Sequence, residues 1–130
     1  MTSFFAEMGF YVWPLVLIAL AIAGLSVRAW IQLRDASPET LGPIAHSVNA
    51  VLFWGCVAAL VGVLGQFHGI YQALKFISAA PAISPPIIWG GLAVSFTSTL
   101  AGLSILLVAA LLWSALRGSL NRHERQLRAA

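Results

Sequence analysis

Within the apolar stretches of this sequence, one group of side chains able to do chemistry is a run of hydroxyls. Ser95, Thr97, Ser98 and Thr99 are nearly consecutive and would extend around more than half the circumference of a helix. Such a run could line a water-filled path for ions. The alternative is that each hydroxyl donates to the carbonyl three or four residues earlier in its own helix. The sequence favours this local arrangement and leaves the pore arrangement open.

A second group consists of Gln66 and His68, which lie close together in the preceding apolar stretch. A histidine inside a membrane could bind haem or chlorophyll, relay a proton, or simply form a hydrogen bond with a neighbour. His46 would lie near the opposite end of the same helix, so it is not spaced to share a metal. We expect a simple hydrogen bond, with no cofactor and no metal, and keep a proton relay or a ligand role for His68 as alternatives.

The sequence contains no recognisable catalytic arrangement. Its four acidic residues all lie outside the apolar cores of the stretches described below: Glu7, Asp35, Glu39 and Glu124. We find no nucleophile paired with a base, no phosphate-binding loop, no carboxylate pair and no cluster of metal ligands. We therefore expect that the protein is not an enzyme.

The composition predicts that the surroundings of the chain are largely lipid. Of its 130 residues, 60% are apolar and only 8% are charged, whereas soluble domains carry about 25% charged residues. The chain is long enough for one small membrane domain. Its net charge of +3 comes largely from residues beside a predicted span, so we assign it to topology and anionic headgroups and not to nucleic acid.

Three apolar stretches are long enough to cross about 30 Å of hydrocarbon as helices. They cover residues 10–33, 44–77 and 87–116, and a basic tail at residues 117–130 would leave the membrane as a helical extension. The first stretch has no basic residue before Arg28, which argues against a signal peptide and for a retained helix. The prediction is an all-α, integral membrane bundle of three transmembrane helices, formed by residues 1–130.

The distribution of basic residues predicts how the bundle is oriented. Six of the seven Lys and Arg residues flank the first loop or lie in the tail, and three spans put these two regions on the same side. Positive residues gather on the cytoplasmic side, so the N-terminus is expected outside and the C-terminus in the cytoplasm. Lys75 would lie near the outer face.

Small residues recur at three- and four-residue steps on the last two helices. Gly62, Gly65 and Gly69 share one stripe of the second helix, and the third helix carries Gly91 and Gly102. Helices in lipid approach closely through small residues, so we expect these five glycines to pack helices together, and we expect the bundle to be an oligomer.

These two helices resemble the MotA/TolQ/ExbB proton-channel family. Residues 58–70 (AALVGVLGQFHGI) resemble the family's pattern A-P-x-x-G-L-x-G-T-V-x-G-I. Residues 91–103 (GLAVSFTSTLAGL) resemble its pattern G-I-A-E-A-L-x-x-T-x-x-G-L without a gap. The expected topology is also that of the ExbB and TolQ members.

The resemblance implies a function in ion transport. It makes Thr99 the pore-facing threonine of the third helix, with Ser95 and Gln66 supplying further polar groups along the ion path. Family members assemble as pentamers around two copies of a single-span partner of the ExbD/TolR/MotB type, whose membrane aspartate carries the proton. The resemblance thus implies a stator-like subunit of a proton-driven channel or motor in the bacterial inner (cytoplasmic) membrane, in contact with lipid and not with nucleic acid.

The sequence departs from the family patterns at several positions. Gln66 replaces the pore threonine of the second helix, and Val94 replaces the acidic residue of the third. Ala59 and Val108 replace two prolines, and the first loop is very short. These departures leave open an alternative function, that of a non-conducting structural or assembly subunit in a larger respiratory or photosynthetic membrane complex.

Overall fold

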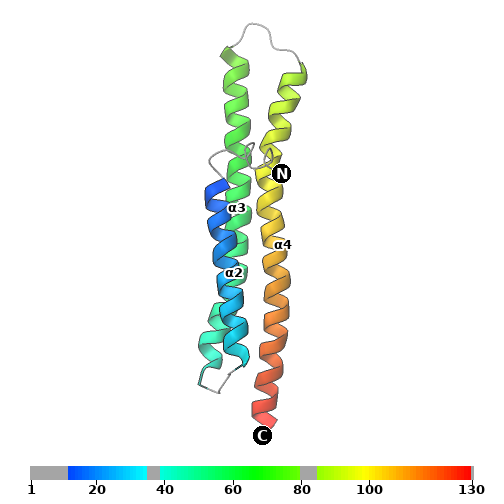
Figure 1. Cartoon of the computed structure of the whole chain (residues 1–130). Helices are drawn as coiled ribbons and strands as arrows, with labels where there is room; N and C mark the ends of the chain where they lie inside the picture. The colour runs from blue at the N-terminus through cyan, green and yellow to red at the C-terminus, as the bar shows by residue number, and fades with distance from the viewer. Residues whose placement is uncertain (1–11, 35–38, 80–84, 130) are drawn as a thin grey trace.

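The computed structural model consists of three long α-helices that run antiparallel in chain order (Figure 1). It describes residues 12–34, 39–79 and 85–129, and among these all except Glu39 and Thr40 are helical. The helices are α2 (Val12–Arg34), α3 (Leu41–Ala79) and α4 (Pro85–Ala129). Each is long and apolar enough to cross a membrane, which confirms the predicted all-α bundle of three spans.

Prolines mark the beginnings of two helices. The helix predicted from Ile44 begins three residues earlier, at Leu41, and the Ile44 N–H donates to the Thr40 carbonyl over 3.2 Å. Pro43 is tolerated in this first turn because its missing N–H would have no partner there. The same reason allows α4 to begin at Pro85. The predicted start of the first helix at Phe10 lies outside the described residues.

The last helix runs on through the basic segment that was expected to leave the membrane. α4 continues without a break from its apolar part through Gly118 to Ala129. The residues after Gly118 are mostly good helix formers, which outweigh the cost of about 1 kcal/mol for one interior glycine. At 1.5 Å per residue, α4 is about 68 Å long, about twice the thickness of the hydrocarbon core.

The three helices differ in length, so the number of helices that lie side by side changes along the axis of the bundle. α2 has 23 residues, whereas α3 has 39 and α4 has 45. α2 lies beside the lower part of the hairpin formed by α3 and α4, and the upper part of this hairpin extends beyond α2 (Figure 1). In the upper part, α3 and α4 therefore pack mainly against each other.

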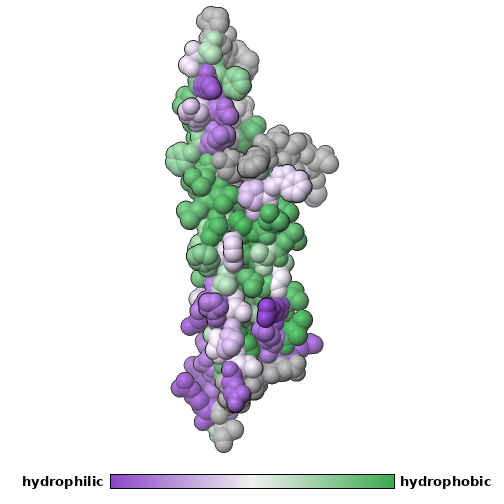
Figure 2. Space-filling model, turned by 90° about the vertical axis from the view of Figure 1, so that its left-hand side faces the viewer, coloured by the Kyte–Doolittle hydropathy of each residue, from purple (hydrophilic) through white to green (hydrophobic). Residues whose placement is uncertain are grey.

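Two clusters of buried residues hold α2 against the hairpin. The first contains Leu15, Ile18, Ile22, Val51, Ala58 and Ala109, and the second contains Ala29, Leu33, Ile44, Val48, Leu116 and Leu120. The α2 members recur every three or four residues and form one stripe, as on any helix that packs by one face. Many side chains on the other faces of the bundle are apolar and exposed, and on the face drawn in Figure 2 hydrophobic residues gather between two more hydrophilic ends. Such a surface suits acyl chains.

Candidate functional site

Small residues bring the backbones of α3 and α4 into direct contact at seven-residue steps. Along this seam, Gly55 faces Ala109, Gly62 faces Gly102, and Gly69 faces Ser95. A Cβ atom built on Gly62 would lie 2.6 Å from the Ser98 carbonyl oxygen, and one built on Gly102 would lie 2.5 Å from that of Ala58. Real side chains do not approach so closely, so these positions require glycine for the observed helix separation.

The five glycines that the sequence suggested for helix packing differ in their surroundings. Gly62, Gly65 and Gly102 are buried, and Gly69 is half-buried against Ser95. Gly91 is exposed, and a Cβ atom built there would lie 3.7 Å from the Cβ of Ala73. Gly62, Gly69 and Gly102 thus face the other helix of their own chain, and contact between copies of the chain stays a prediction.

A hydrogen-bond network crosses the seam at the predicted pore residues. Thr99 on α4 donates its hydroxyl to the side-chain oxygen of Gln66 on α3 over 2.6 Å, and its Oγ1 lies 3.2 Å from the Gly62 carbonyl oxygen. Ser98 also donates to the Gly62 carbonyl, over 3.1 Å. The Gly62 carbonyl can accept these hydrogen bonds because no side chain of Gly62 separates the two backbones.

The run of hydroxyls therefore divides between local and inter-helix hydrogen bonds. Ser95 donates to the Leu92 carbonyl over 2.7 Å, within its own helix, and Ser98 lies 3.2 Å from the Ser95 carbonyl. Both are the local bonds that the sequence favoured. Thr99 is different, since its contacts are all with α3. The structure brings Thr99 and Gln66 together and places Ser95 one turn or so away, buried in the seam.

The exposure of this site decides what it could do chemically. Gln66 and Thr99 are each half-buried, so the pair is partly accessible from beside the hairpin. A hydroxyl and an amide can donate to and accept from water or a carboxylate. Neither titrates near neutral pH, and Val94, at the family's acidic position, is exposed and apolar. The two side chains can hydrogen-bond water or a proton carrier, but they cannot carry the proton themselves.

His68 lies further toward the C-terminal end of α3 than the Gln66–Thr99 pair. Its ring is exposed, and its Nε2 lies 3.4 Å from the side-chain nitrogen of Gln72, one turn further along. Across the residues that the structure describes, no group of three or more His, Cys, Asp or Glu side chains could hold a metal ion. A role for His68 as a relay or ligand stays a prediction.

One polar cluster escaped the sequence analysis. The Asn49 side-chain oxygen on α3 accepts hydrogen bonds from Trp113 Nε1 over 3.2 Å and from Arg117 Nη1 over 3.1 Å, both on α4. The Arg117 guanidinium also lies 5.9 Å from the centre of the Trp113 ring. A signal for this cluster was present in an asparagine within an apolar stretch and in a Trp and an Arg four residues apart.

Comparison with known proteins agrees with the resemblance of the two motifs. Residues 32–129 match the family model described as the MotA/TolQ/ExbB proton channel family. This match includes all of α3 and α4, and with them the seam and the Gln66–Thr99 pair. No curated protein and no solved structure matches the chain.

Proposed function

Because this chain belongs to the MotA/TolQ/ExbB proton channel family, we propose that it is a subunit of a proton-driven channel or motor that couples ion flow to work. The family is one of membrane channels and not of enzymes. The proposed role is to form a polar path through the membrane and to transmit force, with no covalent chemistry.

The observation that carries this proposal is the hydrogen bond between Thr99 and Gln66. It joins the two helices that the family uses around its pore, and both of its side chains are half-buried. Polar side chains in a membrane are costly unless they are satisfied or face water, and they therefore tend to mark ion paths. Gln66 takes the position of a family threonine and keeps both a donor and an acceptor there.

A partner would have to supply the proton carrier. The described residues of α4 from Pro85 to Leu116 include no ionisable side chain, and Val94 stands where relatives have an acid. We propose a single-span partner of the ExbD/TolR/MotB type whose membrane aspartate lies beside Gln66 and Thr99. The Gln66 amide and the Thr99 hydroxyl would then hydrogen-bond the carboxylate in turn as it gains and loses its proton.

The proposed assembly is a pentamer of this chain around that partner, in the bacterial inner membrane. The end of α2, the start of α3 and the end of α4 lie at the same end of the bundle (Figure 1). This end carries six of the seven basic residues, which supports a cytoplasmic location for it.

The test is to purify the chain together with its natural neighbours and to measure the mass of the intact particle. Five copies of the 13.8 kDa chain with a single-span protein, and proton flux in vesicles that depends on the aspartate of that protein, would support the proposal. A particle with one copy of the chain and no flux would contradict it.

A second candidate function is that of a non-conducting structural or assembly subunit in a larger respiratory or photosynthetic complex. Two observations favour it: the glycines of the seam are already in contact within one chain, and Val94 removes the acidic group. A single copy per complex, with unrelated subunits against α3 and α4, would support this second function over the first.

A further inference from the structure

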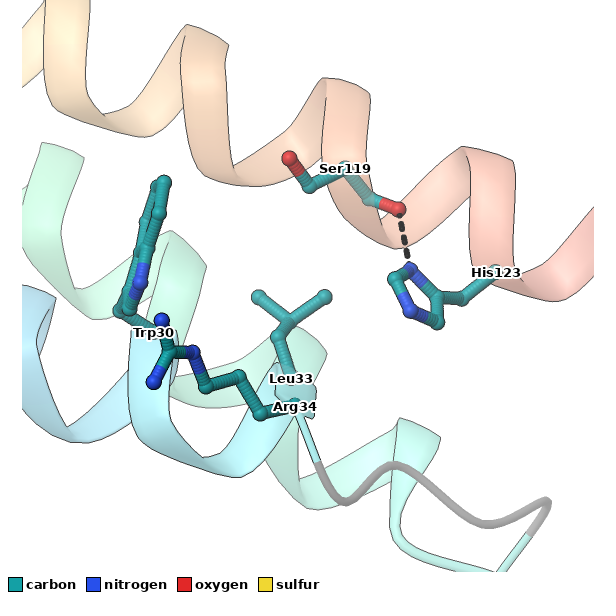
Figure 3. A pocket seen from close by; sticks show the side chains of 5 residues that line it. All are labelled: Trp30, Leu33, Arg34, Ser119 and His123. Carbon is teal, nitrogen blue, oxygen red and sulfur yellow. Dashed lines mark hydrogen bonds between the residues drawn. The ribbon is translucent and has the colours of Figure 1, made fainter.

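A pocket of about 180 Å³ lies between the end of α2 and the extension of α4. It is lined by Trp30, Leu33, Arg34, Ser119 and His123. Figure 3 shows the α2 side chains on one side of the pocket and the α4 residues on the other. The pocket exists only because α4 continues past its apolar part as a straight helix, which puts Ser119 and His123 beside the last turn of α2.

The polar groups of this pocket are suited to an anion. Within the described part of the chain, no hydrogen bond or ion pair engages the exposed guanidinium of Arg34. A guanidinium has five N–H donors in a planar fork that matches the oxygens of a phosphate. Among the described residues, Arg34 is therefore a charged donor with no hydrogen-bond or ion-pair partner.

The second polar group is held in a defined orientation. His123 Nδ1 lies 3.0 Å from the Ser119 carbonyl oxygen, and a carbonyl can only accept, so Nδ1 carries the hydrogen of this bond (Figure 3). The remaining ring nitrogen, Nε2, takes no part in that bond.

The rest of the lining is apolar and lies at the end of the hydrophobic surface. Leu33 is buried and belongs to the core cluster at this end, whereas Trp30 is 55% exposed. Tryptophan is common where a membrane span meets the headgroups, because its ring is amphipathic. An ion dissolved in water would gain nothing from these two side chains, but the glycerol and upper acyl chain of a lipid would pack on them.

The charge around the pocket is strongly positive. Arg117, Arg122, Arg125 and Arg128 lie on the same segment of α4 as His123, and Glu124 is the one acidic residue of that segment. Basic pockets between transmembrane helices on the cytoplasmic side are known to bind anionic headgroups. We propose that this pocket binds the phosphate of an anionic phospholipid, with Arg34, whose guanidinium lies on the Trp30 side of the pocket (Figure 3), binding the phosphate and with Trp30 and Leu33 contacting the glycerol and acyl part.

A lipid bound in this pocket would hold α2 against α4 at the membrane surface. Bound lipid would bridge two helices that are 85 residues or more apart in sequence at this point and share only part of their length. The proposal does not depend on ion conduction, because Ser119 and His123 lie 20 or more residues after Thr99 on α4, about 30 Å along the helix.

The experiment measures lipid retention by the intact chain in mild detergent, using native mass spectrometry with phosphatidylglycerol and phosphatidylcholine as probes. We expect phosphatidylglycerol to be retained in preference to phosphatidylcholine. Arg34→Gln should weaken its binding about fivefold, the effect of one basic residue at an anionic membrane surface. Arg34→Lys in place of Arg34→Gln should restore part of the binding.

Arg28→Gln is the matched control. Arg28 lies on the same helix, is exposed and carries the same charge, but it lines a groove formed by α2 residues alone. Equal losses in Arg28→Gln and Arg34→Gln would overturn the proposal, because they would show attraction to the overall charge. Failure of phosphatidylglycerol to bind the unaltered chain would also overturn it.

A further measurement distinguishes a lipid from a free anion as the molecule that the pocket binds. Inorganic phosphate added in large excess should neither displace phosphatidylglycerol nor raise the thermal stability of the lipid-free protein. Displacement or stabilisation by inorganic phosphate would overturn the lipid assignment. Circular dichroism spectra of all variants should match that of the unaltered chain, since Arg28 and Arg34 are both exposed.

Discussion

The Thr99 hydroxyl on α4 donates to the Gln66 side-chain oxygen on α3 across 2.6 Å, which directly links two side chains of the two helices at the level of the predicted pore. The pair lies beside the contact between Gly62 and Gly102, where the two backbones are closest. Close packing and polar contacts therefore occur at the same level of the hairpin. Substitutions at Thr99 and at Gly62 test the two features one at a time.

Replacing Thr99 with valine should impair ion flux more than folding. The substitution keeps the shape of the side chain but removes the donor to Gln66, and inter-helix hydrogen bonds in membranes contribute only about 0.6 kcal/mol on average. We expect proton flux in vesicles, measured with the partner present, to fall severalfold while thermal stability changes little. Ser104→Ala is the control, because that exposed hydroxyl bonds only to the Leu100 carbonyl of its own helix. Unchanged flux in Thr99→Val would contradict a pore role.

Replacing Gly62 with alanine should destabilise the protein. The new Cβ atom would lie 2.6 Å from the Ser98 carbonyl oxygen, so the two backbones would have to separate. Overpacking of this kind costs about 1–3 kcal/mol. We expect a lower melting temperature in detergent, measured by circular dichroism. At Gly24 a Cβ atom meets nothing within 4 Å, and Gly24→Ala should leave the melting temperature unchanged or raise it. Similar melting temperatures for both variants would show that the seam is looser than described.

The register of α3 against α4 can be tested by a disulfide. A Cβ atom built on Gly91 lies 3.7 Å from that of Ala73, within the usual range of about 3.5–4.5 Å for a disulfide. With Cys56→Ala as background, Ala73→Cys combined with Gly91→Cys should oxidise readily within one chain. Loss of maleimide labelling without a change of mass on a gel would show this.

The matched control for the disulfide uses the neighbouring glycine. A Cβ atom built on Gly90 meets nothing within 4 Å, so Gly90→Cys with Ala73→Cys should remain labelled. A band of twice the monomer mass from the Ala73–Gly91 pair would instead mean that these helices pair between copies of the chain.

Restoring an acid at Val94 should be tolerated if this part of α4 faces a hydrated path. An ionised side chain facing lipid costs about 2.5–3.5 kcal/mol at the centre of a membrane, whereas one facing water does not. Val94 is 39% exposed in the single chain. We expect Val94→Glu to assemble normally and to raise proton flux with the partner present. Leu100 is 61% exposed and lies roughly 120° away around the helix, so Leu100→Glu should reduce membrane insertion and yield. Equal losses of yield would place Val94 against lipid.

The sequence was sufficient to predict the number, type and approximate length of the membrane spans, because these depend on local properties. A continuous apolar stretch of some twenty residues must satisfy its backbone polar groups internally and therefore becomes a helix in lipid. The family motifs were also recognisable from residues 58–70 and 91–103, and the family match over residues 32–129 confirms the assignment. Boundaries were less exact: Leu41 and Pro85 begin their helices earlier than predicted, because proline fits a first turn.

Which residues meet across the bundle was decided only by the tertiary structure. The register of α3 against α4 follows from the fit of glycine on one helix to small residues on the other, and no property of either helix alone contains it. That register brings Thr99 to Gln66 and Asn49 to Trp113. It also explains why the hydroxyls divided as they did, since Ser98 and Thr99 are turned toward the Gly62 carbonyl on α3, whereas Ser95 bonds within its own helix. A hydrogen bond depends on the relative position of two atoms, and two helices 20 or more residues long can slide past each other by whole turns without any change in their hydropathy.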